Sequence, residues 1–518
     1  MKFDRLLVFL LAAAFMVRAI IIFLPVFLPD KNYLISNSIV MDDALITLKI
    51  AKNIYSGTGF SFDNVEKTNA SSFIWTYMLS PFGFLDKGSF ILFSAVLCAV
   101  FFVLSGYLLY RICKNVFGGR EVAMIIVLLY LFNPFFVLVS INGLETSLFV
   151  FFLLLSVFWY VTRVRTGKIN RFNTVLFSIL LALTMLTRND GIYLFLAFAL
   201  DYLFVFRGIR LKERLKHFLF MLIIFVIFVS PVFILNYMEF GYFQTSSAYY
   251  YYSVFAKDMT RNLFSAVFRK ALVFAMTVSI MSLMVGNIVL SFFGFFASKK
   301  FRGGISLLCP LIIFSLFELA HYSIIMPILR LRYILAATVI LVIGLGLFFS
   351  RIKRRSECLF IVSVLAIFIV LCYFTAATWT GYTDIGDSEI RVGILLNRHI
   401  INAANFMENE HPDSMIGVSH IGTFAYFSPS TIISDRNGKI SYEATDYNMQ
   451  NKIDEYFEKR GVEYLAGFFS KENLEKVIDS DIVFSEPVTH RWLLKFRHNF
   501  GYYAVVKFRK DYVRLMSL

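Results

Sequence analysis

Long apolar segments separated by short polar ones follow one another through the first three quarters of the chain. They lie at about 5–29, 88–111, 121–140, 146–162, 173–188, 190–206, 217–237, 270–297, 304–326, 331–350 and 356–376. Because about 20 consecutive apolar residues span the hydrocarbon core of a bilayer, the pattern predicts a polytopic α-helical membrane protein with about eleven transmembrane helices.

The pattern changes after residue 376. A helical pattern covers 390–408, and short β-like runs lie near 416–418, 431–434, 464–468, 482–484 and 502–508. A helical pattern at 450–460 lies between them. Alternating strands and helices predict a small α/β domain. We therefore expect a transmembrane domain at 1–376, with a first external loop at 30–72, and a water-exposed domain at 377–518.

Composition supports membrane integration, because 58% of the residues are hydrophobic and 16% are charged, against about 25% charged in soluble domains. The net charge of +15 does not indicate a nucleic-acid partner. From residue 377 onward there are 16 Lys and Arg against 19 Asp and Glu, so the basic excess belongs to the membrane part.

The basic residues of the membrane part gather in alternate loops, at 111–120, 163–171, 207–216, 299–302 and 351–355. The positive-inside rule places these loops, and the N-terminus, in the cytoplasm. An odd number of spans then places the C-terminal domain outside it, which predicts a multi-pass protein of the bacterial inner membrane. Residues 1–29 show no small-residue cleavage site and are interpreted as the first span. The five cysteines form no paired motif.

The first external loop contains Asp42 and Asp43 at the start of a helical pattern that runs to about Tyr55. At about 100° per residue, Asp42 shares a polar face with Lys49, Lys52 and Asn53, while Asp43 falls on the apolar side. This pattern predicts an amphipathic helix at the membrane surface. One aspartate is either a helix N-cap or a general base that takes a proton from an attacking hydroxyl.

These residues resemble the first-loop pattern of GT-C glycosyltransferases, and most closely that of the mycobacterial terminal arabinofuranosyltransferase type and its bacterial relatives. Asp42-Asp43-Ala44, Ala51-Lys52-Asn53 and Gly57-Thr58-Gly59 match in order, although the Gly-Tyr and Pro that flank the family's later Thr-Asn are missing around Lys67-Thr68-Asn69-Ala70. Further resemblances, in order, are Asn142–Thr146, Thr187–Gly191, Leu331–Tyr333, Gly422–Tyr426 and Ser434–Gly438.

The resemblance implies an inverting transfer of a sugar from a polyprenyl-phosphate donor to a cell-envelope glycan, lipid or protein on the extracytoplasmic side. A pentofuranose such as arabinofuranose is one candidate sugar. Membrane lipids are the surrounding partners. No cofactor is required, and a divalent cation is compatible with the family but not indicated.

We expect Asp42, and after it Asp43, to be catalytic. Arginine suits the phosphate of the donor because its planar fork binds two oxygens, so Arg188, Arg330, Arg332 and Tyr333 are the expected donor-phosphate residues. The remaining substrate-binding candidates are Asn69, Trp75, Glu145, His420 and Asp435, and no metal site is predicted.

Each of these residues also has a structural interpretation. The arginines are interfacial anchors or ion pairs with Glu145 or Asp190, and Glu145 is a helix cap. The pair Glu318 and His321 is a buried polar contact, a proton relay or a metal pair. The run Tyr249–Tyr252 is an interfacial aromatic belt or a lipid or sugar contact.

Two other classes of function compete with the enzyme. A transporter or flippase for lipid-linked glycans explains the spans, but the chain shows no inverted repeat. A non-catalytic envelope assembly protein explains the C-terminal domain through a bound partner. A transporter does not readily explain two aspartates at the start of an external amphipathic helix or a long folded C-terminal region.

Overall fold

The computed structural model describes most of the two regions that the sequence predicts. The described residues are 4–24, 27, 39–65, 67–69, 72–117, 119–164, 170–205, 210–261, 302–325, 339, 343, 346, 349–350, 352–354, 356–362, 364–365, 387–437, 439–488 and 501–517.

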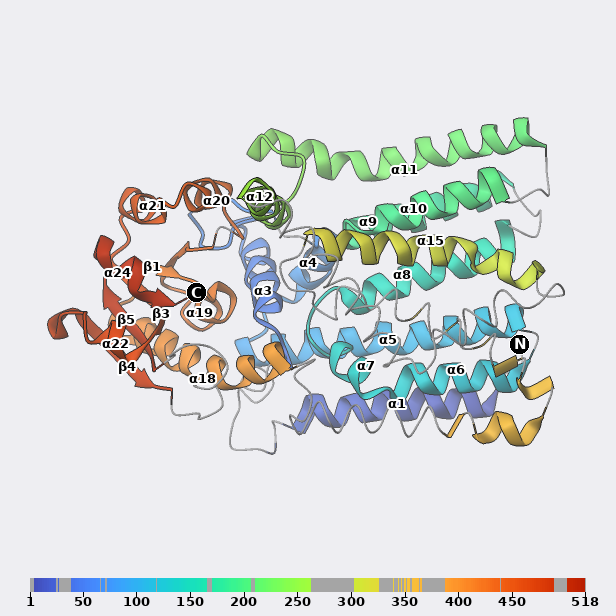
Figure 1. Cartoon of the computed structure of the whole chain (residues 1–518), viewed down its shortest axis with the longest axis horizontal. Coiled ribbons are helices and arrows are strands. Elements are labelled where there is room, and N and C mark those ends of the chain that lie inside the picture. The colour runs from blue at the N-terminus through green and yellow to red at the C-terminus, as the bar shows by residue number, and fades with distance from the viewer. Residues whose placement is uncertain are drawn as a thin grey trace.

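A bundle of helices running side by side forms one end of the molecule (Figure 1). Its members are α1 (Arg5–Phe23), α5 (Lys87–Phe117), α6 (Arg120–Phe132), α8 (Thr146–Trp159), α9 (Arg171–Thr187), α10 (Gly191–Leu200), α11 (Leu211–Phe240) and α15 (Arg302–Ile325). Short π-helical turns, Tyr160–Val164 and Asp201–Val205, extend α8 and α10. Apolar side chains from all eight helices meet in one buried cluster.

Among the described residues, four helices are long and apolar enough to cross a membrane: α1, α5, α8 with its extension, and α11. Three shorter apolar helices lie at Arg171–Thr187, Gly191–Val205 and Pro310–Tyr322. The predicted segment 270–297 lies outside the described residues, as do nearly all of 331–350 and most of 356–376. The total of eleven spans therefore stays a prediction.

The predicted segment 121–140 is two helices rather than one. It divides at Asn133, which is extended (φ −61°, ψ 120°), and α7 (Pro134–Val139) begins at the next residue. Proline lacks the amide hydrogen that an α-helix needs and disfavours helical geometry in the residue before it, so the break is local in origin.

A buried guanidinium, that of Arg18, joins α1 to the region of α6 and α7. Arg18 donates from Nε to Ser140 Oγ (2.6 Å), from Nη1 to the Ala14 carbonyl (2.9 Å) and from Nη2 to the Leu131 carbonyl (3.0 Å). Its guanidinium carbon also lies 4.7 Å from the centroid of the Phe102 ring. Three polar acceptors and an aromatic face offset the cost of burying this group.

Helix α3 (Asp42–Tyr55) lies between the bundle and the C-terminal region (Figure 1). The same loop continues through α4 (Phe73–Leu79) and a short 3₁₀ turn, Ser80–Phe82. Helix α12 (Ser246–Arg261), from the second large external segment, lies beside α20 (Tyr442–Met449) of the C-terminal region.

The C-terminal region contains a six-stranded mixed sheet. The strands are β1 (Met415–Val418), β2 (Ile432–Asp435), β3 (Tyr464–Phe469), β4 (Ile482–Pro487), β5 (Tyr502–Lys507) and β6 (Met516–Ser517). The order is β2-β1-β3-β5-β4, with β1 parallel to β2 and β3, β5 antiparallel to β3 and β4, and β6 antiparallel to β3. Around it lie α18 (Asp387–Glu410), α19 (Ile421–Phe427), α21 (Ile453–Arg460), α22 (Lys471–Leu474) and α24 (Lys510–Leu515).

The two faces of this sheet pack against different clusters. In β5, Tyr503 and Val505 join a cluster with α3, α4, α5, α18 and α19, whereas Ala504 and Val506 join a second cluster with α21 and α24. Side chains alternate along a strand, so one strand supplies both clusters. The first cluster is shared between the external loop and the C-terminal region, which makes these parts one packed unit.

The sequence predicted that α3 lies on the membrane surface with its polar face in water. In the structure, protein covers this polar face. Lys49 and Asn53 are buried. Lys49 Nζ donates to the Pro429 carbonyl (3.3 Å), and Asn53 Nδ2 donates to the Ser61 carbonyl (2.8 Å). The amphipathic pattern was correct, but the partner of the polar face is protein.

We predict that Gly422→Ala destabilises the contact between α3 and α19. An alanine Cβ at 422 would lie 2.0 Å from the Asp42 carbonyl oxygen, which is backbone and cannot move aside cheaply. Overpacking of this kind costs about 1–3 kcal/mol. The expected result is a lower thermal unfolding midpoint of the purified protein and faster proteolysis of the C-terminal region. Gly119→Ala is the matched control, because its nearest neighbour would lie at 3.9 Å. Equal midpoints for the two variants would contradict the prediction.

Candidate active site

The two aspartates of the external loop occupy the first turn of α3. The N-cap is Met41, which is extended (φ −86°, ψ 155°) and makes no side-chain cap, so neither aspartate is the N-cap that the structural interpretation expected. Their negative charges lie at the positive end of the helix dipole. The turn is also held from the bundle, because Met41 N donates to the Asn142 carbonyl (3.4 Å).

Asp42 faces the C-terminal region. Its Oδ1 accepts hydrogen bonds from Thr423 N (2.6 Å) and Thr423 Oγ1 (2.8 Å) at the start of α19. The neighbouring His420 has a buried Nδ1 with no hydrogen-bond partner among the described residues. Burial lowers the pKa of this imidazole, and the Asp42 carboxylate opposes the change. Asp42 thus joins α3 to α19.

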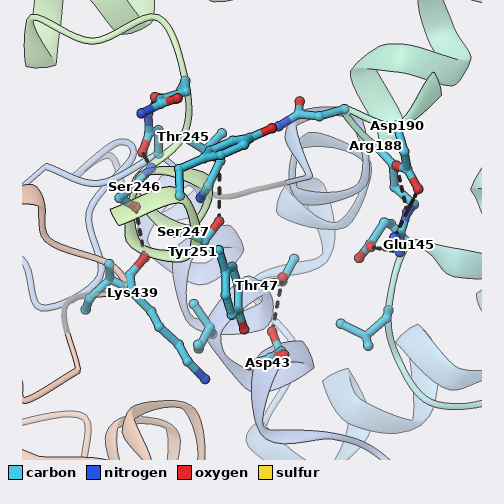
Figure 2. Close-up of a pocket in the computed structure, with 18 of the residues that line it drawn as sticks. Asp43, Thr47, Glu145, Arg188, Asp190, Thr245, Ser246, Ser247, Tyr251 and Lys439 are labelled. Carbon is cyan, nitrogen blue, oxygen red and sulfur yellow. Dashed lines mark hydrogen bonds and ion pairs between the residues drawn. The ribbon is translucent and has the colours of Figure 1, made fainter. Parts of the chain in front are cut away.

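Asp43 faces a cavity of about 390 Å³ between the bundle and the C-terminal region (Figure 2). Successive helical residues point about 100° apart, so one aspartate faces α19 while the next faces the cavity. The cavity lies in the size range of small-ligand pockets, roughly 300–1,000 Å³. Its walls come from α3, the turn between α9 and α10, α12, α15 and residues 439–440. The polar lining residues include Asp43, Thr47, Glu145, Arg188, Asp190, Tyr251 and Lys439.

Arg188 forms a buried ion-pair cluster at one side of this cavity (Figure 2). Its Nη1 lies 3.1 Å from Glu145 Oε1, and its Nε lies 3.2 Å from Asp190 Oδ1. Nη2 donates to Tyr322 OH (2.8 Å), which in turn donates to Asp190 Oδ2 (2.9 Å). Burial lowers the pKa of Arg188, but Asp190, Tyr322 and Glu145 outweigh burial and raise the pKa well above its ordinary value. The guanidinium is a permanent cation with two anionic partners.

The opposite rim of the cavity is a junction of three distant segments. Asn69 Oδ1 accepts from Ser246 N (2.8 Å), and Asn69 Nδ2 donates to Tyr442 OH (2.8 Å). Ser246 Oγ donates to the Lys439 carbonyl (3.0 Å), and Thr68 Oγ1 donates to the Ile440 carbonyl (2.8 Å). The external loop, α12 and the C-terminal region therefore build the rim together.

The tyrosine run belongs to this region. Tyr251 and Tyr252 line the cavity, and Tyr249 OH donates to Asp446 Oδ1 (2.6 Å). His321 lines the cavity too, with its Nδ1 at 2.7 Å from Tyr193 OH.

The other candidates predicted from the sequence take different places. Trp75 is buried in the shared cluster and donates from Nε1 to the Gly143 carbonyl (3.0 Å). Glu145 is the N-cap residue of α8 without a side-chain cap, because its carboxylate faces Arg188. Asp435 accepts from Asn437 N and from Ile440 N (both 2.9 Å). Arg330, Arg332 and Tyr333 lie outside the described residues.

Sequence reasoning missed Lys439, Thr47 and Tyr322. A lone lysine or hydroxyl in a loop or helix carries no pattern of its own, although Lys439 follows the Ser434–Gly438 motif directly. Across the described part of the chain, no three His, Cys, Asp or Glu side chains group as metal ligands would.

Comparison with known proteins concerns mainly the bundle. Residues 71–234, about a third of the chain, match the family model "Dolichyl-phosphate-mannose-protein mannosyltransferase". This is a GT-C family, and the match confirms the resemblance to GT-C glycosyltransferases for that segment. No curated protein matches the chain in sequence.

The solved structures that this chain matches are only distantly similar to it. One is the archaeal oligosaccharyltransferase AglB from Archaeoglobus fulgidus in complex with an inhibitory peptide and a dolichol-phosphate, with 13% identity, a TM-score of 0.48, and coverage of 90% of this chain and 69% of that one. Another is the Archaeoglobus fulgidus oligosaccharyltransferase in complex with Zn and sulfate, with 13% identity, a TM-score of 0.47, and coverage of 82% and 64%. At these scores the likeness establishes neither fold nor activity, and the GT-C assignment is carried by residues 71–234 and by the sequence motifs.

Proposed function

We propose that the protein is a membrane glycosyltransferase that transfers a sugar from a polyprenyl-phosphate donor to a hydroxyl acceptor, with Asp43 as the general base. The observation that carries the proposal is the carboxylate of Asp43 on the wall of a ligand-sized cavity in which bundle, external loop and C-terminal region meet. The matched family model supports the class of enzyme.

Asp43 replaces Asp42 as the preferred base because the two carboxylates have different surroundings. Asp42 Oδ1 is used by two donors of Thr423, at 2.6 and 2.8 Å. Asp43 lines the cavity, next to the hydroxyl of Thr47, which donates to the Asp43 carbonyl (3.4 Å). A base must lie within reach of the proton that it removes.

The reaction is a single displacement. The acceptor oxygen forms a bond to the anomeric carbon of the sugar while Asp43 takes its proton. The bond between that carbon and the phosphate oxygen breaks, and its electron pair stays on the lipid phosphate. Attack opposite to the leaving group inverts the anomeric configuration. The negative charge that grows on the phosphate requires positive charge in the site.

A lipid-linked donor agrees with the position of the cavity. Its lining includes residues at the ends of the apolar helices α9, α10 and α15 together with residues of the external loop. This arrangement would let a polyprenyl chain stay in the bilayer while its sugar occupies the cavity. The acceptor is a glycan, lipid or protein on the extracytoplasmic side of the bacterial inner membrane. A pentofuranose such as arabinofuranose is the proposed sugar. Assays of purified protein with polyprenyl-phosphate pentofuranose and hexose donors test the class of reaction and the sugar, and transfer from neither would reject the proposal in favour of a flippase or an assembly protein.

We expect Asp43→Asn to lower the turnover by roughly 100-fold or more, the usual scale for a lost acid–base group. Asparagine is nearly isosteric and accepts no proton at neutral pH. The measurement is steady-state transfer from a donor that the wild-type protein uses.

Asp42→Asn is the matched control for this variant. Its amide oxygen still accepts from both donors of Thr423, so turnover should stay within a few-fold of wild type. If Asp42→Asn abolished transfer and Asp43→Asn did not, the base would be Asp42, as the sequence alone suggested.

A second prediction concerns Arg188. We expect Arg188→Met to lower the thermal stability strongly, because breaking a buried ion pair costs about 3–5 kcal/mol. Its side chain is 8% exposed, against 12% for Glu145 and 3% for Asp190. Adding Glu145→Gln should restore part of the stability by removing one uncompensated carboxylate.

The unfolding midpoint and the donor KM of both variants check this prediction. A ligand of the donor phosphate would behave differently: Arg188→Met would raise the donor KM without lowering the midpoint, and Glu145→Gln would not compensate.

A further inference from the structure

The described lining of the cavity includes two basic side chains, Arg188 and Lys439. They lie on opposite sides of the cavity and come from different parts of the chain (Figure 2). Arg188 belongs to the bundle, and Lys439 belongs to the C-terminal region. A nearby cation stabilises the charge of an anionic leaving group, so both side chains are candidates among the described residues.

Arg188 is already committed to protein anions. All three of its guanidinium nitrogens donate to Glu145, Asp190 or Tyr322. With two carboxylates against one cation, the cluster offers no surplus positive charge. A phosphate would have to displace a carboxylate from its partner and leave it buried, which costs several kcal/mol.

Lys439 is held at the rim by its backbone. The loop that carries it follows β2, and Asp435 at the end of β2 closes this loop by accepting from Asn437 N and Ile440 N. On the cavity side, the Lys439 carbonyl accepts from Ser246 Oγ (3.0 Å). Hydrogen bonds on both sides thus fix the point from which the side chain starts, and Figure 2 shows that side chain extending beneath Tyr251 toward α3.

The charge of Lys439 acts on two groups near the start of α3 and α12. Burial raises the pKa of Tyr250, and the Lys439 charge opposes that rise. The same charge adds to the effect of burial in lowering the pKa of His420, next to Asp42. Lys439 and Asp43 also line the same cavity.

We infer that Lys439 binds the phosphate of the lipid-linked donor and that Asp435 is its positioning residue. The inference rests on the proposed function. An ammonium beside the departing phosphate oxygen stabilises the negative charge that develops there. The C-terminal region then completes the donor site, and the motif Ser434–Gly438 acts by shaping the loop rather than by touching the sugar.

The experiment measures binding of polyprenyl phosphate, without a sugar, to the full-length protein in nanodiscs, together with the donor KM and kcat. We expect Lys439→Gln to weaken binding and raise the donor KM by about tenfold or more, the scale of a charge-assisted hydrogen bond. Lys439→Arg keeps the charge and should stay within about threefold of wild type. Lys452→Gln, a half-exposed lysine of the same region, is the matched control and should change neither quantity.

Asp435→Ala tests the positioning role. It should raise the donor KM in the wild-type background and add little to Lys439→Gln, because both changes remove the same contact. Additive effects of the two changes would show that Asp435 acts only on stability.

The inference and the proposed function fail in distinguishable ways. If the wild-type protein transfers sugar and Lys439→Gln binds polyprenyl phosphate as tightly as wild type, the assignment of Lys439 is wrong and the enzyme stands. If the wild-type protein binds polyprenyl phosphate through Lys439 but transfers no sugar, the proposed function is wrong and the phosphate site stands.

Discussion

The contact between α3 and α19 is the interaction on which the rest of the candidate site depends. Asp42 accepts two hydrogen bonds from Thr423, and Gly422 allows the two backbones to approach closely. Around this polar contact, side chains of the external loop and of the sheet share one apolar cluster. The cavity has walls from both regions, so it keeps its shape only while they remain packed together.

This packing gives two adjacent aspartates different roles. One carboxylate is satisfied by protein donors and acts as a structural link, while its neighbour is turned by about 100° toward a cavity. Electrostatics in the cavity follow the same division. Arg188 is neutralised by Glu145 and Asp190 inside the bundle. On the opposite rim, the Lys439 carbonyl accepts a hydrogen bond from Ser246 Oγ. Charge in a partly buried site is strong and costly to leave unpaired, so the position of each partner determines the electrostatics of the cavity.

The rim shows how distant segments come to depend on one another. Asn69 bonds Ser246 and Tyr442, which are 177 and 373 residues away in sequence. A tyrosine cluster reinforces the junction, with the rings of Tyr242 and Tyr442 stacked at 4.5 Å. The rim of the cavity and the packing of the C-terminal region are therefore linked through the same few side chains.

The sequence by itself determined the local features of this protein. Apolar runs predicted the helices of the bundle, short β-like runs predicted β1 to β5, and a 3.6-residue period predicted α3. Each pattern reflects how an element is buried. What the pattern cannot specify is the partner that covers a face. The polar face of α3, with Lys49 and Asn53, was expected to face water. It is covered by protein instead, and Lys49 donates to the carbonyl of Pro429, which lies 380 residues away in the sequence. Which of Asp42 and Asp43 faces the cavity, the burial of Trp75 and the place of Lys439 were decided by tertiary structure alone. Each depends on a contact between segments that no local periodicity encodes.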